Sequence, residues 1–396
     1  MPWLINMNIN SINNLSHKCY GCGACFNVCP FCSIKMTLDA EGFYFPEVQN
    51  SCMNCGKCLS VCPILENKTT NNDFSAFYWC YSIDDKVRLH SSSGGIFTEL
   101  AKIIFSKNGV VIGAGFDQNV NLEHRIAENE CELSALRGSK YVQSNKSDIL
   151  SVTKKLLEQK KIVAFFGTPC EIHGLKNFLG VEYENLITVD FVCHGVPSPM
   201  VFKNTIRNFE RQKNSKVINF SFREKVNGWR DQTAVVYYSN GTKECIKSSN
   251  FDYYTLFLGN YFLRHSCYTC NFPNSHIADL TLGDYWQAVN DDDKGVSLVS
   301  INSMKGKMLF TELSSRLVTG PLSKKEVNAC FTNHSCDNHY DARLREKFFF
   351  NYFKCGHIKT LKKFYLIEKF KSVITKMKYY CVAIAKRIRC IFNVKK

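Results

Sequence analysis

The sequence predicts a multidomain α+β protein: a small cysteine-rich domain, a larger α/β domain with a mixed sheet, and a basic amphipathic helical tail. Three observations lead to this prediction. Eight cysteines recur in two identical runs between residues 19 and 62, strand-like and helix-like segments alternate from 74 to 330, and lysines and arginines accumulate after 340. We expect domains over 13–65, 74–330 and 340–396, the second divided into an N-terminal part (about 74–150) and a C-terminal part (about 151–330).

The spacing C-x2-C-x2-C-x3-C-P occurs twice in the cysteine-rich stretch, ending at Pro30 and at Pro63. This spacing is typical of bacterial ferredoxins with two [4Fe–4S] clusters, in which the fourth cysteine of each run binds the other cluster. One cluster is therefore expected on Cys19, Cys22, Cys25 and Cys62, and the second on Cys52, Cys55, Cys58 and Cys29.

Glycines within these runs fit the same interpretation, because a loop that caps an iron–sulfur cube must curl tightly. Gly21, Gly23 and Gly56 permit that curl. Paired C-x2-C steps also bind structural zinc, but two complete runs, each ending in proline, favour clusters. Cys32 falls outside the runs and is expected to be a small buried residue behind the cluster.

Composition restricts the compartment and the partners. The chain has 396 residues, 21 cysteines and a net charge of +15. Residues 1–15 lack a secretory pattern, and no uncharged apolar stretch reaches the roughly 18 residues of a membrane span, so we expect a cytoplasmic protein without disulfides. Residues 340–396 hold 16 Lys and Arg against three Asp and Glu, which leaves the rest nearly neutral. Nucleic-acid binding is not expected, because no recognised module supports it.

The middle region begins with a small-residue loop at 91–95 that leads into a helix near 96–105, followed by a strand at 110–116. Hydroxyl and backbone N–H groups at a helix start can bind phosphate, although a capped helix start is also common without a ligand. Strands near 162–166 and 186–192 flank a helix near 172–179, which predicts a right-handed parallel unit. Cys170 and Cys193 then emerge at the same sheet edge, where such folds place ligands.

A further cysteine pair follows antiparallel strands near 217–222 and 233–248 and a helix near 251–263. Cys267 and Cys270 could join Cys170 and Cys193 as four thiolates, enough for a third cluster. A zinc site, a redox disulfide and buried structural cysteines are alternatives that spacing leaves open. The other nine cysteines show no ligand spacing.

In the tail, apolar residues recur at three- and four-residue intervals from 364 to 392, with lysines and arginines between them. This pattern is typical of a basic amphipathic helix. Such a helix could lie on an anionic membrane surface, dock on a partner, or cover the protein's own core, and the sequence leaves these alternatives open.

Several short motifs together resemble the family of coenzyme F420 hydrogenase/dehydrogenase beta subunits, in a form with a ferredoxin domain fused in front. The resemblance covers about residues 15–320, and the basic tail lies outside it. Its carriers are 91–98 (SSSGGIFT), 137–144 (RGSKYVQS), 167–170 (GTPC), 190–197 (DFVCHGVP), the pair Cys267 and Cys270, and 278–286 (ADLTLGDYW).

The resemblance implies an FAD-binding flavoprotein with a third [4Fe–4S] cluster on Cys170, Cys193, Cys267 and Cys270. It also implies flavin contacts from the two loops, namely Ser92, Ser93, Gly94 and Gly95 in the first and Gly138, Ser139 and Lys140 in the second. No catalytic residue follows from it. The Asn-, Lys- and Ile-rich sequence indicates an AT-rich bacterial genome, and bacterial relatives are often associated with surface-polysaccharide gene sets.

Clusters pass single electrons, whereas hydride carriers exchange two, and a flavin can do both. We therefore expect a flavin-dependent iron–sulfur oxidoreductase that connects a redox partner protein or low-potential donor, through the clusters and FAD, with a hydride-type substrate such as coenzyme F420 or another acceptor. Peripheral contact with the inner membrane surface through the tail is part of this hypothesis. The alternatives are a non-catalytic ferredoxin-type adaptor for a partner enzyme and a cluster-bearing redox regulator.

Overall fold

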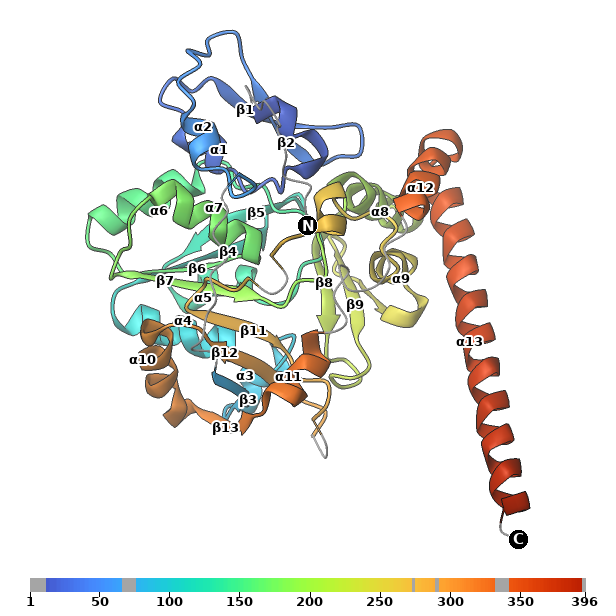
Figure 1. Ribbon diagram of the computed structural model, residues 1–396. Helices are drawn as coiled ribbons and strands as arrows, with labels where there is room; N and C mark the ends of the chain where they lie inside the picture. Colours follow the sequence, from blue (N-terminus) through green and yellow to red (C-terminus); the bar gives the residue numbers. More distant parts are fainter. Residues whose placement is uncertain (1–11, 66–75, 273–274, 289–291, 332–341, 394–396) are drawn as a thin grey trace.

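The computed structural model describes residues 12–65, 76–272, 275–288, 292–331 and 342–393. It contains a two-stranded, a three-stranded and an eight-stranded sheet, with helices packed around them (Figure 1). The predicted mixed α+β architecture with a ferredoxin-like N-terminal domain is confirmed. Residues 66–73, which separate the first two expected domains, lie outside the described residues.

The N-terminal module is built around the two cysteine runs. Its two strands, β1 (Ile34–Leu38) and β2 (Tyr44–Val48), pair antiparallel. Short helices follow the glycines of each run, α1 (Ala24–Val28) and α2 (Lys57–Ser60), and the 3-10 helix η1 (Ile12–Lys18) precedes the first run. In Figure 1 this blue module sits against α6 (Ile149–Glu158) and α7 (Pro169–Leu179) of the body. Asn27 fixes the seam, because its amide donates to the carbonyl of Ser147 and its side-chain oxygen accepts from the Ser151 amide, both at 3.0 Å.

The eight-stranded sheet has the order β13-β3-β12-β11-β7-β6-β4-β5. Its four central strands are parallel to one another and its outer strands are antiparallel, so the sheet is mixed as expected. The strands are β3 (Ala76–Ser82), β4 (Val110–Phe116), β5 (Leu122–Ala127), β6 (Val163–Phe166), β7 (Leu186–Phe191), β11 (Leu280–Asp284), β12 (Ser297–Ile301) and β13 (Leu317–Leu322).

Helices cover both faces of this sheet because its central strands are apolar on both sides. Val111 of β4 faces the cluster formed with α4 (Ile96–Ser106) and α10 (Met304–Leu313), whereas Val110 and Ile112 face α6 and α7. Smaller helices complete these layers: α3 (Asp85–Leu89), α5 (Glu130–Leu136) and α11 (Lys324–Phe331).

A separate antiparallel sheet holds the strands expected after residue 217, in the order β10-β9-β8. These strands are β8 (Val217–Glu224), β9 (Thr233–Tyr238) and β10 (Lys243–Lys247). They share an aromatic core with α8 (Pro199–Lys213), α9 (Asp252–Leu258) and α12 (Ala342–Cys355). The helix expected over 251–263 is shorter than predicted, because Gly259 ends it.

The first part of the C-terminal helix α13 (His357–Asn393) packs on the body, with side-chain contacts as far along as Lys371. Leu361 and Phe364 are buried in the aromatic core, whereas Phe370, Ile374 and Met377 are exposed. Figure 1 shows the red helix extending away from the rest of the chain. No helix among the described residues is long and apolar enough to cross a membrane.

Candidate functional site: cysteine clusters beside a large cavity

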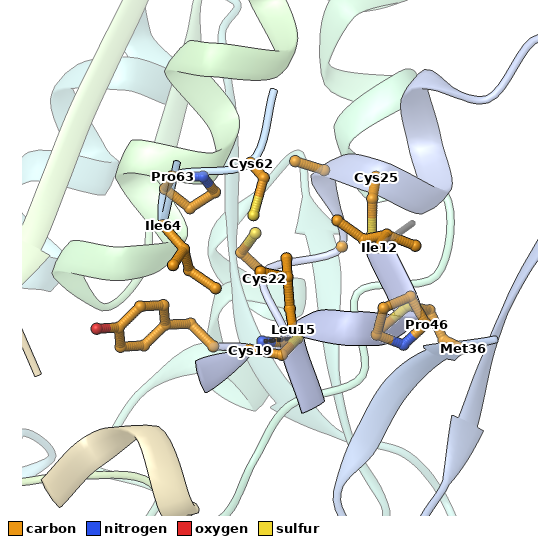
Figure 2. Close-up of a pocket in the computed structure, with 14 residues that line it drawn as sticks. Ile12, Leu15, Cys19, Cys22, Cys25, Met36, Pro46, Cys62, Pro63 and Ile64 are labelled. Atoms are coloured by element: carbon orange, nitrogen blue, oxygen red, sulfur yellow. Dashed lines mark hydrogen bonds between the residues drawn. The ribbon is translucent and has the colours of Figure 1, made fainter. Parts of the chain in front are cut away.

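The first predicted ligand set comes together in the N-terminal module. Cys19, Cys22, Cys25 and Cys62 all line one small cavity, and Figure 2 shows the sulfur atoms of Cys22 and Cys62 pointing toward one another. Burial raises the pKa of the Cys62 thiol to about 11, and the neighbouring thiols of Cys19 and Cys58 contribute to this rise. A group of thiols in an apolar environment ionises readily only when a cation compensates the charge, which is what bound iron supplies.

The glycines assigned to the curl of the loops adopt the required conformation. Gly21, Gly23 and Gly56 have φ angles of 68°, 80° and 73°, in the left-handed region that favours glycine. At Gly23 and Gly56 this conformation falls at the residue preceding a helix, so that α1 and α2 begin immediately after the turn.

The second predicted set lies nearer the surface. Cys55 is exposed, and Cys29, Cys52 and Cys58 are partly buried. Burial raises the pKa of Cys58, and the thiols of Cys52 and Cys55 add to this effect. Cys29 packs beside Cys58 against the same small core.

The expectation for Cys32 was wrong, since its side chain is exposed rather than buried behind the cluster. It follows the turn after Pro30 with a φ of 50°, and this left-handed backbone directs the chain outward.

Backbone amides donate to the sulfur atoms of several predicted ligands. The amides of Gly21, Ser33 and Asn54 lie 3.3, 3.3 and 3.4 Å from Sγ of Cys19, Cys29 and Cys52, respectively. Hydrogen bonds of this kind stabilise thiolates and tune cluster potentials. Cys80, which belongs to no predicted set, differs from them: burial raises the pKa of its thiol with no other contribution.

The third predicted set is drawn from three distant parts of the body. Cys170 lies in the first turn of α7, Cys193 follows β7, and Cys267 and Cys270 lie in and after the 3-10 helix η3 (His265–Thr269). Burial raises the pKa of Cys193, and the thiols of Cys170 and Cys267 raise it further. The backbone brings the same segments together, because an added Cβ at Gly195 would lie 3.5 Å from the Cys267 Cβ.

Cys270 acts on the same residue as two other members of this set. Burial raises the pKa of the Tyr20 hydroxyl, and the thiols of Cys270, Cys170 and Cys267 raise it further. The amides of Val196 and Phe272 lie 3.3 and 3.5 Å from Sγ of Cys267 and Cys270, respectively. The structure shows all four as free cysteines.

The first and third sets are adjacent in space. Tyr20 lies between Cys19 and Cys22 in sequence and is close to the third set. The Cys22 side chain packs directly on Gly174 of α7, where an added Cβ would lie 2.7 Å from its sulfur. Gly174 is one helical turn after Cys170, so the two residues share a face of α7. The N-terminal module therefore docks beside the third set.

A cavity of about 460 Å³ lies on the other side of Cys193. This volume falls within the range of small-molecule and cofactor sites. Six of the seven predicted flavin contacts line it, namely Ser92, Ser93, Gly95, Gly138, Ser139 and Lys140. Thr168, whose hydroxyl lies 3.2 Å from Sγ of Cys170, and Cys193 line it as well, so the cavity and the third set share a wall.

Gly94, the seventh predicted contact, does not line the cavity. Its amide donates to the Ser297 hydroxyl at 2.9 Å, and an added Cβ would lie 2.5 Å from the Cys80 carbonyl oxygen. Gly94 is therefore turned toward the sheet, where close packing of the loop on β12 requires the absence of a side chain.

Lys140 has an additional contact pattern that its position in the sequence did not indicate. Its ammonium group donates to the carbonyls of Leu136, Arg137 and Gly138 at 2.9, 2.7 and 3.1 Å. Burial lowers its pKa to about 7. Lys140 thus fastens the turn that presents Gly138 and Ser139 to the cavity.

Sequence reasoning missed the residues that hold the Ser92 loop. The Ser92 carbonyl accepts from Arg223 Nη2 and from Trp229 Nε1, both at 3.1 Å. Arg223 is buried and pairs with Asp284 at 2.7 Å. Asp284 belongs to a motif already singled out, but no local signal points to Arg223 or Trp229, because they come from another sheet and its loop.

A buried charged group on the cavity wall was also missed. Glu171 pairs with Lys146 and lies 3.9 Å from His124 Nε2. Burial alone would raise the pKa of Glu171, but the Lys146 ammonium group, His124 and the Thr168 amide together outweigh burial and lower this pKa to about 2. The negative charge next to Cys170 is thereby neutralised.

Across the described residues, no three His, Cys, Asp or Glu side chains converge closely enough to hold a single metal ion. A cluster differs from such a site, because its irons are bound by separate cysteines.

The fold and the cysteine runs define the class: an iron–sulfur protein with a ferredoxin-type module in front of a mixed-sheet α+β body. Comparison with known families agrees. Residues 18–65 match a 4Fe-4S dicluster domain, and residues 160–325 match the C terminus of the coenzyme F420 hydrogenase/dehydrogenase beta subunit. The chain therefore carries the C-terminal domain of this family of beta subunits behind a dicluster ferredoxin domain, which confirms the resemblance inferred from the sequence.

Individual relatives are distant. One of the subunits of the F(420)H(2) dehydrogenase of Methanosarcina mazei is 22% identical over 172 residues, which are 40% of this chain and 47% of that protein. The chain thus aligns with less than half of this relative. A chain of the F420-reducing [NiFe] hydrogenase complex from Methanosarcina barkeri is 17% identical with a TM-score of 0.45, covering 76% of this chain and 92% of that one.

Proposed function

We propose that this protein is an iron–sulfur flavoenzyme that exchanges single electrons with a redox partner and a hydride with a small-molecule substrate. The observation that carries the proposal is the position of Cys193. Its thiol lies among those of Cys170 and Cys267, and its residue also lines the large cavity. A cluster at this place would be in contact with whatever the cavity binds.

The proposed electron route follows the order of the cysteine sets. The second set is nearest the surface, and exposed Cys55 and Met53 offer a place where an external carrier can approach. The first set shares a small core with the second through Cys25, Cys58 and Cys62. The contact between Cys22 and α7 then leads to the third set. The proposed ligands are the twelve cysteines named from the sequence.

The cavity wall suits a flavin with a phosphate-bearing tail. Gly95 precedes α4, and the first two residues of this 11-residue helix, Ile96 and Phe97, line the cavity with their backbone amides at the helix start. Such amides, together with the Ser92 and Ser93 loop, favour an anionic group. When bound, FAD would supply the exchange between one- and two-electron chemistry. Arg223, fixed by Asp284, keeps the Ser92 loop in place and puts a buried positive charge at the wall.

The proposal is tested by purifying the protein anaerobically and measuring iron, sulfide and flavin per chain. We expect about 12 irons, four for each of three clusters, and one flavin. About 8 irons without flavin would instead support the alternative of a two-cluster adaptor that only relays electrons. About 12 irons and one flavin would justify a screen of hydride donors, starting with coenzyme F420 and nicotinamides.

We also propose that α13 contacts an anionic membrane surface peripherally. Its support is the sequence charge of 340–396 together with exposed Phe370, Ile374 and Met377 on a helix that leaves the body. Basic amphipathic helices bind such surfaces through buried apolar area and attraction to anionic lipid. In a sedimentation assay, the full chain should pellet with phosphatidylglycerol vesicles, whereas a chain ending at Lys371 should not. Neither chain should pellet with phosphatidylcholine vesicles. Equal binding of the two chains would contradict this part.

A further inference from the structure

Arg264 lies buried between the first and third cysteine sets. The residue is 1% exposed. Its amide donates to the Val196 carbonyl at 2.7 Å, and its own carbonyl accepts from the Cys267 amide at 2.9 Å. The backbone of Arg264 is thus part of the loop that carries the third set.

The Arg264 side chain reaches the loop of the first set. Its Nε donates to the Cys19 carbonyl at 2.6 Å, and the hydroxyl of Ser266 donates to the same oxygen at 2.9 Å. An added Cβ at Gly21 would lie 3.1 Å from Nη1, so the guanidinium group lies directly against this loop. On another side the guanidinium carbon is 4.0 Å from the centre of the Phe45 ring.

Among the described residues, no carboxylate pairs with this guanidinium group to explain its burial. Nη1 and Nη2 are both buried and have no hydrogen-bonding partner among the residues that the structure describes. A buried cation is expensive unless a negative group compensates it. Here the adjacent negative group would be the thiolate-bound cluster itself, on the loop that starts at Cys19.

We propose that Arg264 is a positioning residue that raises the reduction potential of the cluster held by Cys19, Cys22, Cys25 and Cys62. The inference rests on the proposed function, because it requires that this cluster is present. On reduction the cluster gains one negative charge, and a nearby buried cation favours the more negative state.

A second buried arginine provides the matched control. Arg345 is 6% exposed, and its Nε donates to the Leu263 carbonyl at 3.0 Å, next to Arg264 in sequence. Unlike Arg264, it pairs with a carboxylate, that of Glu41. Burial raises the pKa of Glu41 and Arg345 opposes this rise. Without Arg345 the Glu41 carboxyl should take up a proton, so the net charge stays the same and cluster potentials should change far less.

The test is a potentiometric titration followed by electron paramagnetic resonance on the full chain and on Arg264→Gln, Arg264→Lys and Arg345→Gln. At a fixed ambient potential, Arg264→Gln should lower the reduced-to-oxidised ratio of one cluster about tenfold, which is 59 mV for a one-electron couple. Arg264→Lys, which keeps the charge, and Arg345→Gln should each change it less than about threefold. The shift should persist when Cys193→Ala is added, because the affected cluster belongs to the first set.

Iron and sulfide analysis of the same samples separates the possible failures. A wild-type chain without clusters would refute the proposed function. Full iron with unchanged potentials in Arg264→Gln would refute only the role of Arg264. Equal potential shifts in Arg264→Gln and Arg264→Lys would refute it too, because they would indicate lost hydrogen bonding rather than lost charge. Should Arg264→Gln assemble incompletely, a tenfold shift in Arg264→Lys would equally overturn the inference.

Discussion

Gly174 offers a direct test of how the ferredoxin-type module docks on the body, through the substitution Gly174→Ala. The new methyl group would lie 2.7 Å from both Cβ and Sγ of Cys22. Favourable carbon contacts lie at about 3.5–4.0 Å, so the Cys22 loop or α7 must shift by about 1 Å. Overpacking of this kind costs about 1–3 kcal/mol, whereas alanine gains up to about 1 kcal/mol over glycine in a helix.

We therefore expect the free energy of unfolding to fall by about 0–2 kcal/mol, together with a loss of about four irons per chain, since the displaced side chain is a proposed cluster ligand. Chemical denaturation and iron analysis measure the two effects. Lys176→Ala on the same helix is the control, because it removes only an ion pair with the exposed Glu182 at 3.4 Å, worth about 0–1 kcal/mol. Wild-type iron and unchanged or higher stability in Gly174→Ala would refute the docking described here.

Three further substitutions test other parts of the structure. Cys193→Ala should lose about four irons and keep the two clusters of the N-terminal module, and iron analysis showing loss of all iron would contradict the assignment. Lys140→Met should lower the free energy of unfolding by about 1–3 kcal/mol, because three carbonyls lose a donor; unchanged urea denaturation would argue against the clamp. Burial lowers the pKa of His357 to about 4, below its value of about 6.5 in the unfolded chain. The unfolded chain therefore binds a proton at His357 before the folded chain does, and the free energy of unfolding falls as the pH drops from 6.5 toward 4. The free energy of unfolding should fall by about 1 kcal/mol per pH unit, and this fall should be absent in His357→Asn. The same change in melting temperature for both proteins between pH 7.5 and 5.5 would count against it.

Local patterns were sufficient to predict the cluster-binding module and much of the parallel sheet. The cysteine runs and their glycines need only short-range geometry, because a tight loop brings three thiols together whatever surrounds it. The strand predicted at 110–116 matches β4, and those at 162–166 and 186–192 match β6 and β7 to within one residue. Buried parallel strands read as continuous apolar runs, and for that reason they were found.

The pairing of strands that are distant in the sequence has no comparable local pattern. The placement of β3 between β12 and β13 joins residues more than 200 positions apart, and only packing of the whole sheet decides it. For the same reason, the position of Arg223 beside Ser92 and the burial of Arg264 against Cys19 could not be predicted from neighbouring residues.

The sequence by itself thus determined which residues could bind clusters and which loops could meet a cofactor, since both depend on residue type and local spacing. Only the tertiary structure decided how these parts are connected: that Cys22 rests on the α7 face of Cys170, that Cys193 lines a large cavity, and that the buried Arg264 side chain lies against the Cys19 loop. Distances between remote segments are set by the packing of sheets and helices, and those distances govern how electrons and charges interact.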